Sequence, residues 1–295
     1  MKIAVDAGHG NDTAGKRTPP VPEDIDFNKD GTIDVKKGES IREHTANVGV
    51  ASYLIKELKR CGFETVQTGF NDDNPYDDDD TPIAVRQSTI LTAKCDYSVC
   101  IHFNASGNGE TFNSAEGVGV YIHDKYSNNS EELADVVLKY LIKGTTQKNR
   151  GITKQSLAMC NCNSLGVKGA ILAELAFMTN LKEATELMAS EAFWKESAIE
   201  ICMGICEFTG KKYVEEIIVP TKTITANSSK EDIKWLQNIL NTVLTGESFI
   251  PLAVDGIYGS RTRIAVLVYW EIRGWNQDCA KDGRSAGMGT IEALS

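Results

Sequence analysis

The sequence predicts an α/β protein with a mixed central sheet flanked by helices, followed by a small, mainly helical second domain. In the first two thirds of the chain, short apolar runs that end in glycine or polar residues alternate with stretches of helical periodicity, as strands and helices do in such a fold. A polar stretch then interrupts the pattern, and a helical pattern resumes after it. We therefore predict a first domain over residues 1–210, a linker over 211–229 and a second domain over 230–295.

Composition and charge exclude several classes of protein. The chain has 295 residues and a net charge of −10. We expect no nucleic-acid partner, because nucleic acids require a basic face. No apolar run approaches the roughly 20 residues that cross a bilayer, and no basic start with an apolar core precedes the first strand. We expect no membrane association, and we expect the protein to be made and kept in a cytoplasm.

The eight cysteines lack the spacing of a disulfide framework. In a reducing compartment we expect them to be buried free thiols. Cys202 and Cys206 share a helix face and are interpreted as core residues. Cys160 and Cys162 could bind a metal, although no second pair completes a structural zinc site. The other cysteines are Cys61, Cys95, Cys100 and Cys279.

The first predicted strand, Ile3–Val5, leads directly to a candidate metal ligand. Gly8 and Gly10 stop this apolar run, so His9 lies where a strand ends and the backbone turns. Open α/β sheets build their sites at such strand ends. A neutral imidazole there is a good zinc ligand, but a single histidine taken alone more often has a structural role, so the prediction depends on finding partners.

Three later stretches supply partners for this histidine. Glu43 lies in the first turn of a predicted helix that runs to Arg60, His102 follows an apolar strand that begins at Tyr97, and Glu174 ends another apolar strand. Two histidines and one glutamate are a common catalytic zinc set with an open position for water, and a second glutamate can act as the base. His44 is a rival ligand at the position next to Glu43.

The other elements of the first domain are predicted from the same periodicities and helix-start signals. Ser130 is expected to cap its helix with its hydroxyl group. The acidic segment 71–80 is interpreted as a solvated loop, with a secondary cation site as the alternative. The predicted elements are a strand over 63–68, a helix over 83–93, a strand over 116–122, a helix from 130 to about 143, a strand over 157–160, a strand over 169–174 and one or two helices over 183–209.

A second candidate cation site lies in the long irregular stretch before Ser40. Asp26, Asn28, Asp30 and Asp34 match the start of a calcium-binding loop. The twelfth position of such a loop carries a bidentate glutamate, and here it is Lys37. Calcium binding is therefore one prediction for this segment, and a tight turn rich in Asp, Asn and Gly is the other.

The order His-Glu-His-Glu in these contexts resembles the zinc-dependent N-acetylmuramoyl-L-alanine amidases of the amidase-3 family. The resemblance covers roughly residues 1–210, and its pieces are specific only in combination. These pieces are Asp6–Gly10, Glu43 with Asn47, His102–Ala105, Gly117–Tyr121, Asn149–Gly151 and Glu174–Asn180.

The resemblance implies a substrate, a metal and a role for each site residue. The substrate is peptidoglycan, and the bond cut is the amide between N-acetylmuramic acid and L-alanine. His9, Glu43 and His102 are expected to hold Zn²⁺, Glu174 to act as the base, and Asn104 to position substrate.

Three further residues are interpreted through the same resemblance. Arg86 matches a common arginine of the family and is expected to be a structural ion-pair partner. His44 and His123 have no ligand counterpart in the family. We expect His44 to be a polar surface residue, and His123 to be a surface residue or one that supports a ligand.

The second domain carries a different motif. A helix face that includes Leu236-Gln237 precedes the turn Val254–Gly259, and a second helix carrying Ala265-Val266 follows it. This arrangement resembles the three-helix peptidoglycan-binding domain, although Val268–Trp270 replaces the usual Phe-Gln. A helical dimerisation unit is the alternative.

Several functions stay open from the sequence alone. Within the hydrolases, the alternative is a zinc peptidase that cuts between stem-peptide residues. Outside the hydrolases, the alternative is a non-catalytic wall-binding protein. The complete set of two histidines and two carboxylates argues against this alternative. A wall amidase without a signal peptide fits a phage endolysin that causes host lysis, which we favour, and also a sporulation autolysin freed when the mother cell lyses.

Overall fold

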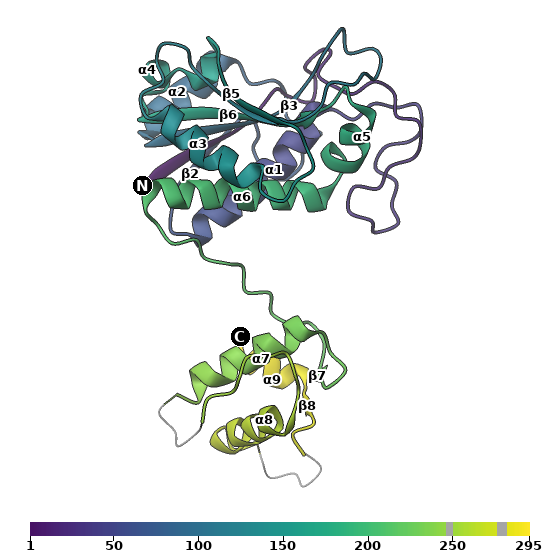
Figure 1. Ribbon diagram of the computed structural model, residues 1–295, viewed down its shortest axis with the longest axis vertical. Coiled ribbons are helices and arrows are strands. Elements are labelled where there is room, and N and C mark those ends of the chain that lie inside the picture. Colours follow the sequence, from purple (N-terminus) through teal and green to yellow (C-terminus); the bar gives the residue numbers. More distant parts are fainter. Residues whose placement is uncertain (246–249, 276–281) are drawn as a thin grey trace. The chain divides into compact units, whose positions relative to one another are not determined.

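The computed structural model describes residues 1–245, 250–275 and 282–295. Within these ranges the chain forms two compact units, Met1–Val214 and Glu215–Ser295, which are described separately (Figure 1). None of the helices in the described part of the chain is long and apolar enough to cross a membrane. The predicted thiol at Cys279 lies outside the described residues.

The first unit is built on a six-stranded sheet with the order β2-β1-β3-β6-β4-β5. Strands β2, β1, β3 and β6 are parallel, β4 is antiparallel to β6, and β5 is parallel to β4. The predicted fold class, a mixed sheet flanked by helices, is confirmed. The strands are β1 (Lys2–Ala7), β2 (Glu64–Thr68), β3 (Tyr97–Asn104), β4 (Val118–Ile122), β5 (Asn149–Lys154) and β6 (Gly169–Phe177).

Helices cover both faces of this sheet (Figure 1). Three helices pack on one face, and two shorter ones pack on the other. The central strands are therefore apolar on both sides, as expected for strands buried between two helical layers. The first face carries α1 (Glu43–Arg60), α3 (Ser130–Leu141) and α6 (Glu191–Thr209), and the second carries α2 (Ile83–Ala93) and α4 (Cys162–Leu165).

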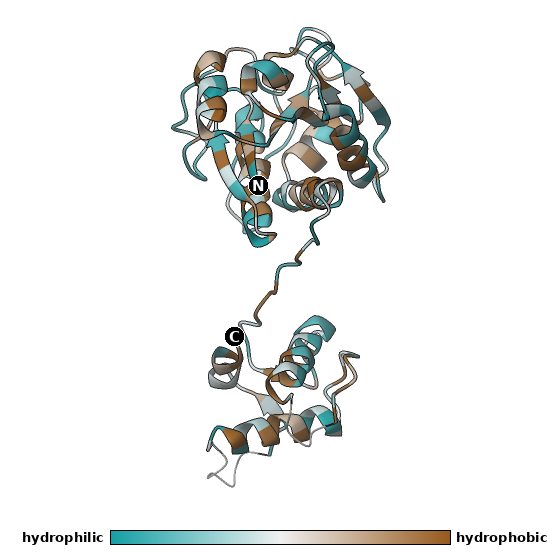
Figure 2. Cartoon of the chain, turned by 90° about the vertical axis from the view of Figure 1, so that its left-hand side faces the viewer, coloured by the Kyte–Doolittle hydropathy of each residue, from teal (hydrophilic) through white to brown (hydrophobic). Residues whose placement is uncertain are grey.

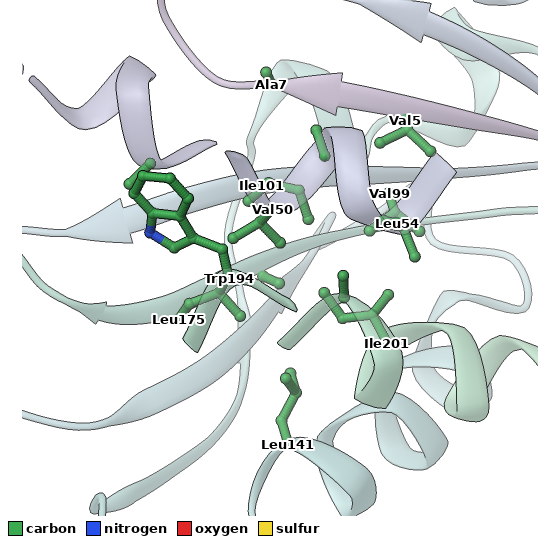
Figure 3. Packing of buried hydrophobic residues seen from close by; sticks show 14 of the residues in the cluster. Val5, Ala7, Val50, Leu54, Val99, Ile101, Leu141, Leu175, Trp194 and Ile201 are labelled. Carbon is green, nitrogen blue, oxygen red and sulfur yellow. The ribbon is translucent and has the colours of Figure 1, made fainter. Parts of the chain in front are cut away.

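The larger hydrophobic core lies between the sheet and the first helical layer. Val5 and Val99 on the strands and Leu54 of α1 belong to the same buried cluster as Ile201 of α6 (Figure 3). Full burial of one such side chain contributes about 1.5–3 kcal/mol to folding. This packing fixes α1 under the sheet, and with it the position of Glu43 at the start of the helix.

A glycine permits the close approach of α3 and α6. A Cβ atom at Gly204 of α6 would lie 2.7 Å from the Cα atom of Val137 in α3. Because the obstacle is backbone, no side-chain rotation would relieve the contact. Gly204 is thus required by the distance between the two helices.

Two local predictions were wrong, and one strand was missed. Residues 157–160 do not form a strand: a 3₁₀ turn (Ala158–Cys160) leads into α4, because the Asn161 side chain accepts hydrogen bonds from the first backbone N–H groups of that helix. Strand β5 was not predicted, because it is polar and mostly exposed and so lacks an apolar pattern. The Ser130 hydroxyl does not cap α3 but accepts a hydrogen bond from the backbone N–H of Ala170.

The segment predicted as one or two helices over 183–209 contains three elements. A short helical turn, α5 (Leu181–Glu183), leads into a π-helical segment (Ala184–Met188), and α6 follows. The Ser190 hydroxyl caps α6 by accepting a hydrogen bond from the Phe193 N–H. This capping residue marks the break that separates α6 from the preceding turn.

The second unit is small and mainly helical. Its helices carry hydrophobic and hydrophilic residues on different sides (Figure 2), and the apolar sides enclose a separate core. Both ends of the predicted linker make contacts within a unit: Tyr213 bonds to Glu57 in the first, and Ile224 is buried in the second. The elements are β7 (Ile224–Thr225), α7 (Lys230–Val243), α8 (Ser260–Ile272), β8 (Ser285–Ala286) and α9 (Met288–Leu294).

A buried glutamine organises the turn between α7 and α8. The Gln237 side-chain oxygen accepts hydrogen bonds from the backbone N–H groups of Asp255 and Gly256. Its nitrogen donates to the Asp255 carboxylate and to the Thr262 hydroxyl. The Leu-Gln and Asp-Gly pieces of the sequence motif therefore form one hydrogen-bonded unit.

The close approach of α3 and α6 gives a stability prediction. Gly204→Ala should lower the free energy of unfolding of the first unit by about 1–3 kcal/mol, the usual cost of overpacking, despite the better helix propensity of alanine. The control is Gly289→Ala in α9, where a Cβ atom meets nothing within 4 Å. Urea unfolding should show the control to be neutral or stabilising, and an equal effect of both substitutions would contradict the packing argument.

Candidate metal centre

The parallel strands bring the predicted site residues to one edge of the sheet. β1 and β6 both pair with β3, so the carboxyl ends of the three strands lie together. His9 follows β1, and His102 and Glu174 occupy directly paired positions on β3 and β6. Glu43, the first residue of α1, completes the group from the helical layer. The structure thus brings together all four residues of the His-Glu-His-Glu set.

Three of these side chains converge on one point. Glu43 lies between the two imidazoles: its Oε1 is 2.9 Å from His102 Nδ1, and its Oε2 is 3.4 Å from His9 Nε2. The ligand atoms of the three residues all lie within 4.8 Å of one another. The His9 and His102 rings are perpendicular, with centroids 4.8 Å apart. Two imidazole nitrogens and one carboxylate are a donor set that suits a divalent zinc ion.

Two carboxylate oxygens at this site have no hydrogen-bond partner in the described part of the chain. Glu43 Oε2 and Glu174 Oε2 are both buried, and neither receives a hydrogen bond from the described residues. An unsatisfied buried carboxylate oxygen is costly, unless a cation or a proton compensates it. The site therefore fits a bound cation beside Glu43.

The backbone at the end of β1 is shaped for this cluster. His9 has a φ of 61°, a left-handed conformation that few residues other than glycine adopt. A Cβ atom at Gly8 would lie 2.2 Å from the His102 ring, so any larger residue would push this imidazole away. Strained backbone of this kind is concentrated at functional sites, where the surrounding structure holds it in place.

Arg86 holds that strained turn in place. Its guanidinium donates hydrogen bonds to the carbonyl oxygens of Ala7 (2.5 Å) and His9 (2.6 Å). It also forms ion pairs with the buried Asp6 (3.2 Å) and with Asp80 (3.0 Å). The expected structural role of Arg86 is confirmed, and the contacts extend it: Arg86 positions the backbone that carries His9.

The site drives the pKa values of the two carboxyl groups in opposite directions. Burial opposes ionisation of Glu43, but the hydrogen bond and the charge of the neighbouring imidazoles outweigh it and lower the Glu43 pKa. Burial raises the pKa of Glu174 to about 8 in the metal-free site. Such a split marks one carboxylate that stays charged, as a ligand must, and one that can carry a proton near neutral pH.

The imidazoles are also perturbed. Burial lowers the pKa of His9 to about 4, so the ring is neutral at pH 7 and its nitrogen is free to bind a metal. Burial also disfavours protonation of His102, but the hydrogen bond to Glu43 and its charge prevail and raise the His102 pKa. A bound cation would displace that proton, because metal and proton compete for the same nitrogen.

His44 and Asp78 do not lie where the sequence suggested, and of the two alternatives for His123 the surface position is wrong. His44 is buried, with Nδ1 2.9 Å from the Gly8 carbonyl and Nε2 3.1 Å from the Asp78 carboxylate. The surface prediction was wrong, because this face of α1 packs on the turn that carries His9. Asp78 is buried by the same contact, although its loop was expected to be solvated. His123 is also buried, and its Nδ1 accepts hydrogen bonds from the backbone of a local turn.

Asn104 lies on the same strand as His102, two residues further on. Its side-chain nitrogen donates a hydrogen bond to the Tyr121 hydroxyl (3.4 Å), and its side-chain oxygen accepts one from the Ala105 N–H (2.8 Å). The backbone carbonyl of Asn104 accepts a hydrogen bond from the Met178 N–H. A small cavity of about 110 Å³ opens beside His9 and His102 and is also lined by Asp80 and Ile83.

Sequence reasoning missed Lys16. Its backbone carbonyl accepts the N–H of Glu43 (2.9 Å). Its positive charge adds to the lowering of the Glu43 pKa by the imidazoles, and it partly opposes the burial that raises the pKa of Glu174. Lys16 lies in an irregular stretch without periodicity, so nothing in the sequence distinguished it from the other lysines of the chain.

The predicted calcium loop is separate from this cluster. Both Asp26 carboxylate oxygens accept backbone hydrogen bonds from the loop itself, including the N–H groups of Lys29 and Gly31 (2.7 Å each). Asp34 accepts the N–H of Phe27 at 2.7 Å. Asn28 and Asp30 are exposed neighbours in the same loop. These contacts are those of a tight turn, and calcium binding stays a prediction.

The buried cysteines include a second group of candidate ligands. Seven free cysteines are buried in the described part of the chain. The Sγ atoms of Cys61, Cys202 and Cys206 lie within 4.8 Å of one another. Cys160 and Cys162 are not part of a metal-binding group among the described residues.

An open α/β sheet with a His-Glu-His cluster at its strand ends is an arrangement suited to metal-dependent hydrolysis. Comparison with known proteins gives the family. The sequence model of the N-acetylmuramoyl-L-alanine amidase family Amidase_3 matches residues 3–207, and the chain belongs to this family. Its members cleave the amide bond between N-acetylmuramic acid and L-alanine, so peptidoglycan is the substrate. No curated protein matches the chain.

Solved structures show the same fold at low sequence identity. An N-acetylmuramoyl-L-alanine amidase from Clostridium difficile 630 is 22% identical, with a TM-score of 0.55 over 72% of this chain and 98% of that one. The catalytic domain of CwlV, an amidase from Bacillus (Paenibacillus) polymyxa var. colistinus, is 22% identical, with a TM-score of 0.55 over 72% of this chain and 99% of that one. The N-acetylmuramyl-L-alanine amidase Ami1 from Mycobacterium smegmatis is 19% identical, with a TM-score of 0.53 over 71% of this chain and 97% of that one. At this identity the likeness supports the fold alone.

The raised pKa of Glu174 gives a pH prediction for the metal-free protein. In the unfolded chain this carboxyl ionises near its usual value of 4.5, whereas in the folded state it keeps its proton to about pH 8. Stability should therefore fall as the pH rises from about 4.5 to 8. Glu174→Gln has no carboxyl group to ionise at this position, so it should not lose stability in this way. Its melting temperature should exceed that of the wild type by a margin that grows with pH, to on the order of 5 °C at pH 8.

Thermal unfolding of the chelator-treated protein between pH 5 and pH 8.5 measures this margin. The exposed Glu23→Gln is the control and should show no trend with pH. A margin for Glu174→Gln that is constant over this range would contradict the buried, proton-holding environment described for Glu174.

Proposed function

We propose that the chain is a zinc-dependent amidase that cleaves peptidoglycan between N-acetylmuramic acid and L-alanine with an activated water molecule. The observation that carries this proposal is the convergence of His9, Glu43 and His102, with ligand atoms within 4.8 Å of one another. Glu174, on the strand next to His102, supplies a second carboxylate. A three-ligand site with an open position and a neighbouring base is the arrangement that hydrolytic zinc uses.

The metal addresses the chemical difficulty of the substrate. An amide is a poor electrophile, and its nitrogen is a poor leaving group. Bound zinc would lower the pKa of a coordinated water to about 7 and polarise the amide carbonyl. His9 Nε2, His102 Nδ1 and a Glu43 oxygen would hold the ion.

Glu174 is assigned the proton transfers. Its Oε2 has no hydrogen-bond partner among the described residues, so it is free to accept a proton from the attacking water. It then delivers this proton to the departing amine nitrogen. A nearby cation lowers the pKa of a carboxyl group, so the bound ion would bring Glu174 from its metal-free value of about 8 towards the ionised form that a base requires.

Asn104 is proposed to position the substrate. It lies beyond His102 on the strand, partly exposed, with its side chain beside Tyr121. An amide side chain there can donate to a carbonyl and accept from an N–H of a peptide, which suits a stem-peptide backbone.

The second unit is proposed to bind peptidoglycan. Support comes from the motif around Gln237 and Asp255, which the structure joins in one hydrogen-bonded turn. Tethering the catalytic unit to the wall would raise the local substrate concentration. The endolysin role, with the protein kept in a cytoplasm and acting on the wall after release, is the biological setting that we propose on the sequence argument.

Mass spectrometry of digested cell walls tests the proposed reaction. Amidase cleavage should create new L-alanine amino termini without new reducing sugars. New amino termini on later residues of the stem peptide would instead show a peptidase, and intact walls that only retain the protein would show a non-catalytic binder.

Substitution of Glu174 should lower turnover, whereas substitution of Glu43 should lower zinc binding. Glu174→Gln should keep near-stoichiometric zinc, because this residue acts on water, and turnover should fall by roughly 10²–10⁴. Glu43→Gln should lose zinc, because a neutral amide is a poor replacement for a carboxylate ligand. Metal analysis of both variants, purified without chelator, makes the comparison direct. If Glu174→Gln loses the metal and Glu43→Gln retains it, the two roles are reversed.

The division of labour between the units gives a further prediction. A protein truncated after Val214 should fold and cleave short soluble muropeptides at a rate near that of the full chain, because the whole catalytic cluster lies in the first unit. On intact walls it should be slower at low enzyme concentration, because the tether is lost. Truncation after Gly210 is the informative comparison: it also removes the Tyr213–Glu57 hydrogen bond and should lower the melting temperature.

Activity on soluble muropeptides and sedimentation with walls measure the two effects. A stable protein truncated after Val214 that cannot cleave muropeptides would contradict the division. So would equal sedimentation of the truncated and full-length proteins with walls.

A further inference from the structure

Three buried thiols meet at the opposite end of α1 from the metal centre. Cys61, Cys202 and Cys206 have Sγ atoms within 4.8 Å of one another, and the Cys61–Cys202 separation is 3.8 Å. The three side chains are at most 7% exposed. Neither the amidase reaction nor the His-Glu-His cluster uses them.

The helices place these thiols together. Cys61 caps the carboxyl end of α1, and Cys202 and Cys206 stand one turn apart on the last part of α6. Residues at this spacing share one face of a helix. Because α1 and α6 pack side by side on the same face of the sheet (Figure 1), that face of α6 meets the end of α1.

We propose that Cys61, Cys202 and Cys206 form a second metal site, which binds a thiophilic ion such as Zn²⁺. In a tetrahedral zinc site with Zn–S bonds of about 2.3 Å, neighbouring sulfurs are about 3.8 Å apart. The Cys61–Cys202 separation equals this value, and all three sulfurs are close enough to share one ion. A disulfide would require about 2.05 Å instead.

The thiolate is the metal-binding form of cysteine. The hydrogen bond with Cys206 raises the pKa of Cys202, and burial raises the pKa of Cys61, so a bound ion would have to displace a proton from each of these thiols. A hydrogen bond from Cys202 lowers the pKa of Cys206 to about 7, and the charge of Lys211 acts in the same direction. The backbone N–H of Val214 donates to Cys61 Sγ at 3.3 Å. The Lys211 ammonium, 2.7 Å from the Gly62 carbonyl, adds a positive charge next to the cluster. Three thiolates and one Zn²⁺ carry a net charge of −1, which this ammonium offsets.

The position of the cluster indicates a structural role. Helix α1 has 18 residues, so Cys61 lies about 27 Å along its axis from Glu43. An ion at the thiols would therefore take no part in amide cleavage. It would join the ends of α1 and α6, and through Val214 it would hold the start of the segment that leads to the second unit.

Cobalt substitution separates this site from the amidase centre. The metal-free full-length chain, kept reduced, is loaded with Co²⁺ and its absorption recorded. Sulfur-to-cobalt charge transfer in the near ultraviolet arises only from thiolate ligands, so the His-Glu-His centre contributes none. We expect the band in the wild type and its loss in Cys61→Ala and in Cys202→Ala. Cys95→Ala, which removes a buried thiol outside the cluster, should keep it.

Zinc content provides the second measurement. The wild type should bind one more equivalent of Zn²⁺ than Cys61→Ala, whereas Cys95→Ala should match the wild type. Absence of the charge-transfer band from the wild type would overturn the proposal whether or not any variant folds. A disulfide between cluster cysteines that persists under these reducing conditions would overturn it as well. Amidase activity is decided separately, because the two sites share no ligand.

Discussion

The candidate site depends on one buried carboxylate. Glu43 stands between two imidazoles at distances of 2.9 and 3.4 Å and has almost no exposure to water. A charge in that position is expensive unless cations or hydrogen-bond donors surround it. The helix that carries it is anchored by the main hydrophobic core. Strand β1, which ends just before His9, and strand β3, which carries His102, are paired in parallel register. The geometry of the cluster is therefore set by the packing of the whole first unit.

Much of this arrangement could be predicted because it depends on local patterns. The bounds of α1 and α2 follow from apolar spacing, and the strands that carry His102 and Glu174 are continuous apolar runs. What escaped prediction depends on contacts between distant segments. Edge strand β5 is polar, so pairing alone makes it a strand. His44 is buried because a loop brings Asp78, 34 residues away in the sequence, into contact with it, and no periodicity encodes that contact.

The supports of the site illustrate the same distinction. Arg86 could be identified as an ion-pair partner, but its hydrogen bonds to the carbonyls of Ala7 and His9 appear only in three dimensions. Lys16 had no sequence signal at all. The cysteine cluster was interpreted as core for a similar reason: Cys202 and Cys206 share a helix face, but their third partner, Cys61, is 141 residues from Cys202. Long-range partners decide whether a buried polar group is structural or ligating.

The central claim is that a metal ion is held by His9, Glu43 and His102, with Glu174 beside it but not bound to it. Anomalous X-ray diffraction at the zinc edge, from crystals of the zinc-loaded protein, tests this most directly. The account predicts a peak about 2.0–2.2 Å from His9 Nε2, His102 Nδ1 and a Glu43 oxygen, with Glu174 outside bonding distance. A peak bonded to Glu174 in place of Glu43, or no peak at the strand ends, would contradict it.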